Sequence, residues 1–336
     1  MISEANALKV NLYTVIAVYF LILVGGIVRS TGAGMGCPDW PKCFDSYVPP
    51  STETALPIGY ESYYVEARQK KNARLSSVLN SIGFSDLADK VNNDPTISEV
   101  TKYDVTKAWI EYINRLIGVL IGLFIILNAA QSFKYWSKNR AVTLLALISF
   151  ILVIFQGWLG SLVVSTNLLP GFISFHMILA LVLVATLLWQ RYLMLPRNES
   201  SFVGSKAVLV LLVLFLIQIV LGVEVRESVD LIKNSMIDRG EWIESLGLTF
   251  YIHRSYSLVI LFLIGFIYYK NRLVWKQVFA LKALTLVILL EIISGAVMAY
   301  FEIPAFVQPV HLILGSLAFG AIFYLFLDSN FKKINS

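Results

Sequence analysis

Three histidines, His176, His253 and His311, are the residues of this sequence whose type and placement point most directly to chemistry. They are the only histidines in the 336-residue chain, and each lies in a long apolar run. A histidine in hydrocarbon is costly, so it is a functional candidate by default, although a single one can also serve as a helix–helix hydrogen bond. All three lie near the same end of their runs. Imidazoles at a shared depth favour metal binding.

His253 and His311 fall on the second and fourth apolar runs of the second half of the chain. Two facing imidazoles in the core of a helix bundle are the ligands that six-coordinate haem iron requires. Imidazole also suits zinc or copper. A zinc site would need third and fourth ligands, and the sequence offers only Glu302, near the surface. We therefore expect this pair to bind haem iron.

The first half of the chain has a different ligand pattern. His176 is present, but Asn114 occupies the position that corresponds to His253. An amide is a poor iron ligand, so a haem in this half would have one strong protein ligand and an open or weakly held sixth position. Open coordination permits chemistry, whereas closed bis-histidine coordination suits electron transfer. The first half is therefore the expected catalytic half.

Glu111 lies one turn before Asn114 on the same helix face, and Phe250 takes its place in the second half. We expect a buried carboxylate at the catalytic site, the alternative being a solvated residue at a helix end. Arg115 and Arg254 follow the two ligand positions. They could pair with haem propionates or extend to the lipid headgroups.

The composition indicates which elements must hold these residues. The chain is 57% hydrophobic and only 15% charged, which is typical of an integral membrane protein. Its net charge of +5 reflects basic loops rather than a nucleic-acid partner. No cleavable signal peptide is evident. Eight apolar runs are long enough to span a bilayer: about 12–29, 109–127, 142–165, 171–190, 206–224, 250–269, 283–301 and 310–327.

Lysine and arginine concentrate in the connections after the second, fourth and sixth runs and in the C-terminal tail. The positive-inside rule therefore places both termini in the cytoplasm and the loop 30–107 outside. Two cysteines in that loop, Cys37 and Cys43, could form a metal pair, a redox pair or a disulfide. An oxidising compartment favours the disulfide. The rest of the loop, with helix-like stretches at 59–80 and 83–92, is expected to form a small cap.

The two halves of the chain also match each other. The Gly-to-Arg spacing at the end of the first run recurs at the end of the fifth, and the glycine-to-histidine separation before His176 recurs before His311. Four intervening spans give both halves one orientation. We predict an all-α membrane protein made of two pseudo-symmetric four-helix bundles in parallel repeat, residues 1–195 with the loop 30–107 and residues 196–336.

At these residues the chain resembles the haem A synthase family. The motifs are Gly-Gly-Ile-Val-Arg-Ser-Thr-Gly at 25–32, Gly-Cys-Pro-Asp-Trp-Pro-Lys-Cys at 36–43, Glu-Tyr-Ile-Asn-Arg at 111–115, and the three histidines. The likeness covers all eight spans but not the 46–107 insertion. The family usually has Glu-x-x-His-Arg in the second span, and Asn114 departs from it. That change affects how the substrate iron is held, with a five-coordinate or water-ligated haem as the options.

The resemblance implies oxidation of the C8 methyl of haem O to a formyl group, giving haem A for cytochrome oxidase. It implies a haem b cofactor between His253 and His311, substrate haem ligated by His176 beside Asn114 and Arg115, Glu111 as the catalytic carboxylate and a disulfide near the substrate. Arg254 stays a candidate propionate partner on its position after His253. It places the protein in a bacterial-type inner membrane. Haem O synthase, an electron-transfer partner and a second copy of the chain are the further partners considered.

Two other function classes compete with the enzyme. A non-enzymatic electron carrier of the cytochrome b kind would have two bis-histidine sites, and only one is available. A transporter would have Gly- or Pro-broken helices at mid-membrane, whereas Pro170 and Pro304 lie in the links between runs. Both alternatives are less consistent with the histidine pattern than the enzyme is.

Overall fold

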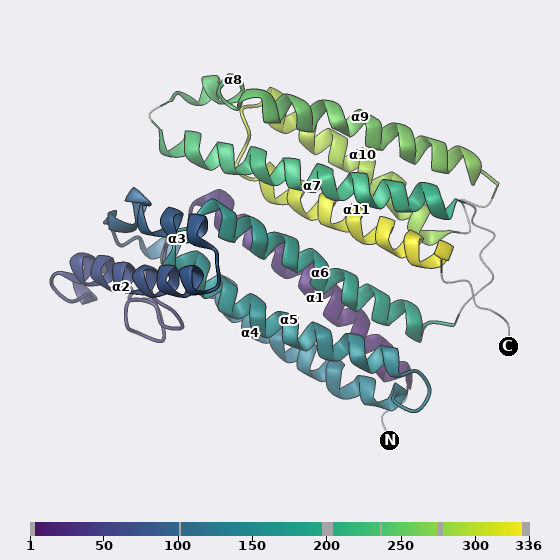
Figure 1. Ribbon diagram of the computed structural model, residues 1–336, viewed down its shortest axis with the longest axis horizontal. Coiled ribbons are helices and arrows are strands. Elements are labelled where there is room, and N and C mark those ends of the chain that lie inside the picture. The colour runs from purple at the N-terminus through teal and green to yellow at the C-terminus, as the bar shows by residue number, and fades with distance from the viewer. Residues whose placement is uncertain (1–3, 101, 197–203, 236, 274–277, 331–336) are drawn as a thin grey trace. The chain divides into compact units, whose positions relative to one another are not determined.

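A computed structural model describes residues 4–100, 102–196, 204–235, 237–273 and 278–330. Eight of its helices are long and apolar enough to cross a membrane, and the chain is a multi-pass membrane protein. The shortest has 22 residues, which at about 1.5 Å per residue reaches about 33 Å. They are α1 (Glu4–Thr31), α4 (Val105–Ser132), α5 (Arg140–Ser165), α6 (Pro170–Met194), α7 (Ser205–Asn234), α9 (Gly247–Lys270), α10 (Phe279–Tyr300) and α11 (Val307–Asn330) (Figure 1).

The all-α membrane class is confirmed: the described ranges contain these helices and further, less apolar helical segments, with no β-strand among them. All eight predicted spans are present, and each helix is longer than its apolar run. The largest difference is α7, which continues from the predicted end near 224 to Asn234. Arg226 and Asp230 form an ion pair of 2.7 Å one turn apart on this extension. Such i,i+4 pairs support a helix beyond its apolar part.

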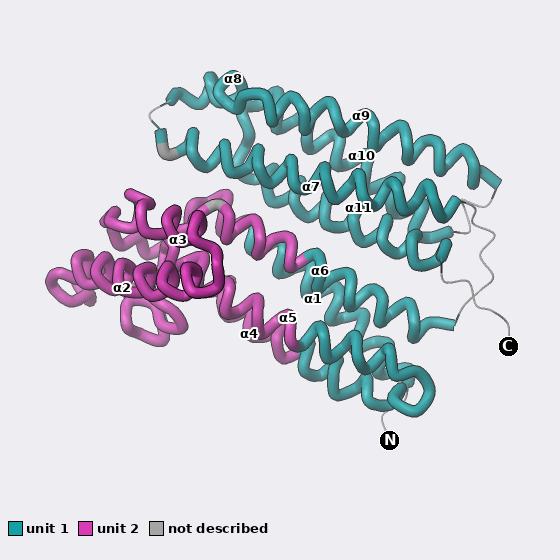
Figure 2. Tube along the Cα trace, in the orientation of Figure 1, with its two compact units in different colours: residues 1–26, 124–150, 181–336 teal, residues 27–123, 151–180 magenta. Residues whose placement is uncertain are grey.

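Contacts along the chain define two compact units (Figure 2). Unit 1 contains residues Met1–Gly26, Phe124–Phe150 and Leu181–Ser336, and unit 2 contains Ile27–Leu123 and Ile151–Ala180. This boundary cuts across the first four long helices and differs from the predicted halves at residue 195. The parallel repeat of two bundles stays a prediction.

In unit 1, α7, α9, α10 and α11 run side by side as a four-helix bundle (Figure 1). Its core is a cluster of apolar residues that includes Leu211, Leu281, Leu284 and Ile322, all fully buried. The same unit holds the amino-terminal part of α1 and the carboxyl-terminal parts of α4 and α6. A shared amide joins these three: Gln190 accepts hydrogen bonds from Asn11 at 3.0 Å and from Asn128 at 2.7 Å.

Unit 2 consists of the other ends of α1, α4, α5 and α6 with the cap, residues 32–104. The cap contains α2 (Tyr60–Ser81) and α3 (Ser85–Asn92), close to the predicted stretches 59–80 and 83–92. Apolar residues of both cap helices pack with Leu159 of α5 and Phe172 of α6. Asn72 also donates a hydrogen bond of 2.9 Å to the Ser165 carbonyl. The cap is thus fastened to the ends of two membrane helices.

Candidate functional site

His253 and His311 lie in the second turns of α9 and α11, inside the four-helix bundle of unit 1. Both side chains are half-buried, and each lies in a helix of the same bundle. The structure therefore places in one bundle the two histidines that the sequence pairs.

A glycine of a neighbouring helix lies against each of these rings. A Cβ at Gly222 of α7 would come within 3.0 Å of Cε1 of His253, and a Cβ at Gly295 of α10 within 3.4 Å of Cε1 of His311. The first distance is tighter than side chains normally tolerate, and the second is at the limit of ordinary van der Waals contact. Glycine at these two positions therefore creates the space that lets each imidazole lie against a helix backbone.

The polar partners of the two rings differ. His311 pairs through Nδ1 with the Ser294 hydroxyl at 2.9 Å, while its Nε2 lies 3.3 Å from Oε1 of Glu291. His253 has a buried Nδ1 without a hydrogen-bond partner, and its backbone carbonyl accepts a hydrogen bond of 3.0 Å from Gln218. A ligating histidine needs one nitrogen for the metal and a partner that fixes the other. Ser294 meets that need at His311.

Glu291 corrects the ligand argument made from the sequence, which considered only Glu302 in this half. Glu291 lies four residues before Gly295, hence on the same helix face, and that spacing was the signal for its position. Even with this carboxylate counted, the part of the chain that the structure describes has no group of three or more His, Cys, Asp or Glu side chains able to hold a metal ion. Two imidazoles in glycine-lined positions, with Nδ1 of His253 unpaired, fit haem iron better than they fit zinc.

His176 lies in the second turn of α6, in unit 2, in an arrangement like that of His253. Its ring faces Gly160 of α5, where a Cβ would be 3.6 Å from Cε1. Gln156 of α5 donates a hydrogen bond of 3.1 Å to the His176 carbonyl. Nδ1 of His176 and Oδ1 of Asn114 are both buried without a hydrogen-bond partner. His176 and Asn114 therefore each have a buried polar atom without a hydrogen-bond partner, as is expected where a ligand would bind.

Glu111 is buried, with 3% of its surface exposed, so the solvated helix-end alternative is wrong. One carboxylate oxygen forms an ion pair with Arg115, one turn further along α4. The other accepts a hydrogen bond of 2.7 Å from the backbone N–H of Cys37. The carboxylate is thus fixed between its own helix and the loop that follows α1.

Cys37 and Cys43 form a disulfide, as predicted. Arg115 holds the loop they close by donating to three of its carbonyls: Asp39 at 2.7 Å, Lys42 at 2.8 Å and Cys37 at 2.9 Å. A side chain at Gly36 would overlap the backbone of Lys107 and Ala108 of α4, so the loop lies directly on this helix. Arg115, which was predicted to lie in a haem pocket, therefore also anchors the loop. The sequence analysis missed this second role.

Arg254, the other predicted propionate partner, lies over two aromatic rings. Its guanidinium carbon is 5.8 Å from the centre of the Phe250 ring and 5.4 Å from that of Tyr251. Cation–π contacts of this kind hold an arginine without using up its N–H donors.

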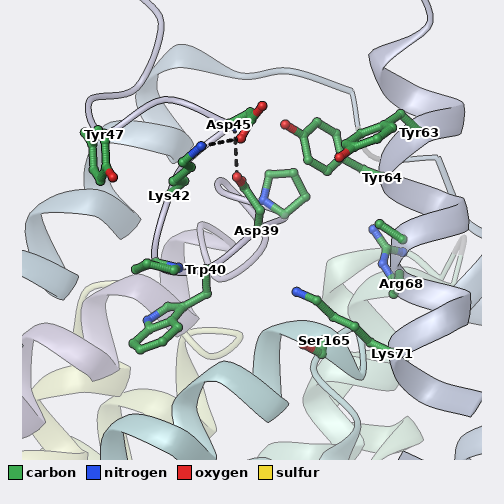
Figure 3. A pocket seen from close by; sticks show the side chains of 13 residues that line it. Asp39, Trp40, Lys42, Asp45, Tyr47, Tyr63, Tyr64, Arg68, Lys71 and Ser165 are labelled. Atoms are coloured by element: carbon green, nitrogen blue, oxygen red, sulfur yellow. Dashed lines mark hydrogen bonds and ion pairs between the residues drawn. The ribbon is translucent and has the colours of Figure 1, made fainter. Parts of the chain in front are cut away.

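A hollow of about 280 Å³ lies between the disulfide loop and cap helix α2 (Figure 3). Asp39, Trp40 and Lys42 line it from the loop, and Lys71 and Ser165 from the opposite wall. Lys42 and Asp45 pair across its rim at 2.7 Å, and Asp39 accepts hydrogen bonds from two backbone N–H groups of the loop. None of the candidate ligands lines this hollow, so the chemistry expected of the histidines belongs elsewhere.

Comparison with known proteins places this arrangement in a family. Residues 9–75 and 91–323 match the COX15-CtaA family, described as cytochrome oxidase assembly protein. The match extends further into the cap than the predicted likeness did, leaving only 76–90 outside it within that span. Three bacterial proteins named heme A synthase are similar over nearly the whole chain. That of Flavobacterium psychrophilum is 23% identical over 88% of this chain and 89% of its own length.

The protein of Rickettsia prowazekii is 24% identical over 94% of this chain and 96% of its own. That of Pelagibacter ubique is 24% identical over 96% of both. The family match reaches into all eight long helices and takes in the disulfide loop, Glu111 and the three histidines. The chain belongs to the haem A synthase family of cytochrome oxidase assembly proteins.

Proposed function

We propose that this protein is a haem A synthase, which oxidises the C8 methyl of haem O to a formyl group and so supplies haem A to cytochrome oxidase. The observation that carries the proposal is the His253–His311 pair, two imidazoles against glycines of one four-helix bundle, in a chain of this family. The protein would reside in a bacterial inner membrane, with both termini in the cytoplasm and the cap outside.

In the second half, His253 and His311 would hold haem b. This group supplies one-electron transfer when it is bound between two histidines. The protein's part is to orient the two rings. Ser294 fixes Nδ1 of His311, and Gly222 and Gly295 give both rings room at the helix backbones. The cation–π contacts of Arg254 leave its N–H donors able to pair with a propionate near this end of the helix.

In the first half, His176 would be the single protein ligand of the substrate haem. Asn114, whose Oδ1 is buried without a hydrogen-bond partner, would leave the opposite coordination position without a strong protein ligand. Gly160 and Gln156 hold His176 as Gly222 and Gln218 hold His253. Asymmetry between the halves thus separates the reacting haem from the electron-transferring one.

Glu111 would provide a fixed negative charge beside the reacting methyl. Its partners support this role: Arg115 and the Cys37 N–H both bind the carboxylate and hold it in one orientation. A preorganised charge in a poorly solvated site stabilises developing positive charge without first having to reorganise. The disulfide loop would serve as the support that keeps Glu111 in place.

The test is haem analysis after co-expression with a haem O synthase in a strain that lacks its own haem A synthase. Haem extracted from the purified protein should contain b-type haem together with o- or a-type haem, and the cells should regain haem A. A protein that carries b-type haem but forms no haem A would instead be an electron carrier. Co-purification of haem O synthase, of a redox protein or of a second copy would identify the further partners.

A further inference from the structure

Each of the three histidines faces a pair of residues with the same spacing on a neighbouring helix. The pairs are Gln156 and Gly160 for His176, Gln218 and Gly222 for His253, and Glu291 and Gly295 for His311. In every case a polar residue lies four positions before the glycine that receives the ring. One turn of helix thus presents both the space for the imidazole and a polar group beside it.

The two glutamines make the same contact. Gln156 Nε2 donates to the His176 carbonyl at 3.1 Å, and Gln218 Nε2 donates to the His253 carbonyl at 3.0 Å. A helical carbonyl already accepts one bond within its own helix and can take a second. Each glutamine therefore ties the backbone of the histidine to the neighbouring helix, in a membrane interior where such bonds have few competitors.

The two glutamines and the histidines they contact also have the same atoms without a hydrogen-bond partner. Oε1 of Gln156 and Nδ1 of His176 are buried without a hydrogen-bond partner, and so are Oε1 of Gln218 and Nδ1 of His253. Each glutamine thus has an unsatisfied acceptor, and the histidine that it contacts has an unsatisfied potential donor. Buried polar groups of this kind are rare and call for a partner. The natural partner of each glutamine Oε1 is Nδ1 of the histidine that the same glutamine contacts.

We propose that Gln156 and Gln218 are positioning residues, each of which holds its histidine by the backbone carbonyl and accepts the Nδ1–H of the same imidazole when Nε2 is bound to iron. This inference rests on the proposed function, because it takes His176 and His253 to be haem ligands. An Nδ1–H bond fixes the tautomer and the ring plane, and the loss of such a partner typically costs 10- to 100-fold in metal affinity.

The third pair shows that the partner of Nδ1 can come from another residue. At His311 the glutamine is replaced by Glu291, and Ser294 pairs with Nδ1 at 2.9 Å. Ser294 therefore takes the part that Gln156 and Gln218 take at the other two histidines. The orientation of His311 should depend on Ser294 and should survive Glu291→Gln, which restores the residue type of the other two pairs.

The experiment compares purified Gln218→Leu, Gln218→Glu and Gln156→Leu proteins by haem b retention during gel filtration and by the low-spin ferric EPR signal. Gln218→Glu keeps the Oε1 acceptor and loses the Nε2 donor, whereas Gln218→Leu loses both. We expect retention to fall in the order wild type, Gln218→Glu, Gln218→Leu, the last by about 10- to 100-fold in affinity. We expect Gln156→Leu to weaken binding of added haem O and to leave the haem b signal unchanged.

Gln308→Leu is the matched control. Gln308 is also a glutamine with a buried, unpartnered Oε1, and it donates at 3.1 Å to a carbonyl, but that carbonyl belongs to Ile303. If Gln218→Leu retains haem b and its EPR signal as Gln308→Leu does, or if Gln218→Glu is no better than Gln218→Leu, the positioning role is overturned. A wild-type protein without low-spin haem b would contradict the proposed function instead.

Discussion

Oε2 of Glu111 accepts a hydrogen bond of 2.7 Å from the backbone N–H of Cys37. This bond joins the second turn of α4 to the first cysteine of the disulfide, and Arg115 completes the junction by binding both the carboxylate and three loop carbonyls. A charge-assisted bond of this kind is stronger than one between neutral groups. The loop and the carboxylate therefore depend on each other.

The first prediction concerns the charge on Glu111. Glu111→Gln keeps an oxygen that can accept from Cys37 N–H but removes the negative charge. Haem A formation should fall by about 10²-fold, with haem O or a hydroxylated intermediate accumulating, because a preorganised charge is lost at the reacting group. Haem analysis and the low-spin b-type spectrum, which should persist, are the measurements. Glu241→Gln, on the exposed segment before α9, is the control. Normal haem A formation by Glu111→Gln would show that the charge of Glu111 has no role in the reaction.

The second prediction concerns the disulfide and its side of the membrane. Cys37 and Cys43 should react with a membrane-impermeant thiol reagent on intact cells only after reduction, because both sulfurs are bonded to each other in the cap. Closure of so short a loop contributes about 2 kcal/mol. Labelling that needs no reductant contradicts the bond in cells. Labelling that needs the cytoplasmic side to be opened reverses the topology.

The third prediction concerns the ligands of haem b. His253→Ala and His311→Ala should each abolish the low-spin b-type spectrum, since either change leaves the iron with a single histidine. His176→Ala serves as the matched change in the other half and should keep that spectrum. The assignment is wrong if both second-half variants are spectrally like the wild type.

The fourth prediction ranks three glycines by the room that their histidines leave. A Cβ would be 3.0 Å from the facing ring at Gly222, 3.4 Å at Gly295 and 3.6 Å at Gly160. Gly222→Ala should therefore displace His253 and reduce haem b content most, and Gly295→Ala should reduce it less. Gly160→Ala should leave haem b unchanged, because the ring it faces belongs to His176, which is not a proposed haem b ligand. Haem-to-protein ratios of the purified variants give the order. An equal effect of all three would show that helix packing, not the ring, is the sensitive feature.

The fifth prediction concerns alkaline pH and the cap. Phe44 is surrounded by the rings of Tyr60, Tyr64 and Tyr103, and burial raises the pKa of all three phenols above the ordinary value. Folding then favours the neutral phenols, so their contribution is complete below about pH 10 and is lost as the pH rises through the folded pKa values.

Proteolysis of the cap should therefore accelerate at alkaline pH, together with phenolate absorbance, while the haem b spectrum of unit 1 persists. A Tyr64→Phe protein is the control, because it keeps the ring packing and removes one titrating group. Its cap should resist alkaline proteolysis better than the wild type. Equal sensitivity of the two proteins would exclude Tyr64 as a cause.

The amino-acid sequence by itself determined the eight helices and the candidate ligands. Long apolar runs have one stable form in a bilayer, because a helix satisfies its own backbone hydrogen bonds, so α1 and α9 could be located without any partner. His253 and His311 were recognisable for a similar reason. Imidazoles in apolar surroundings are costly, and their pairing was predicted from their shared depth and their corresponding places in the two halves.

Tertiary structure decided what those side chains touch. Glu111 was visible as a carboxylate beside Asn114, but its bond to Cys37, 74 residues away in sequence, depends on how the loop after α1 folds back onto α4. Helical periodicity shows which residues share a face, and it does not show which neighbour covers that face. The contact of Glu291 with His311 was hidden in the same way: the spacing was present, but only packing brought α10 and α11 together.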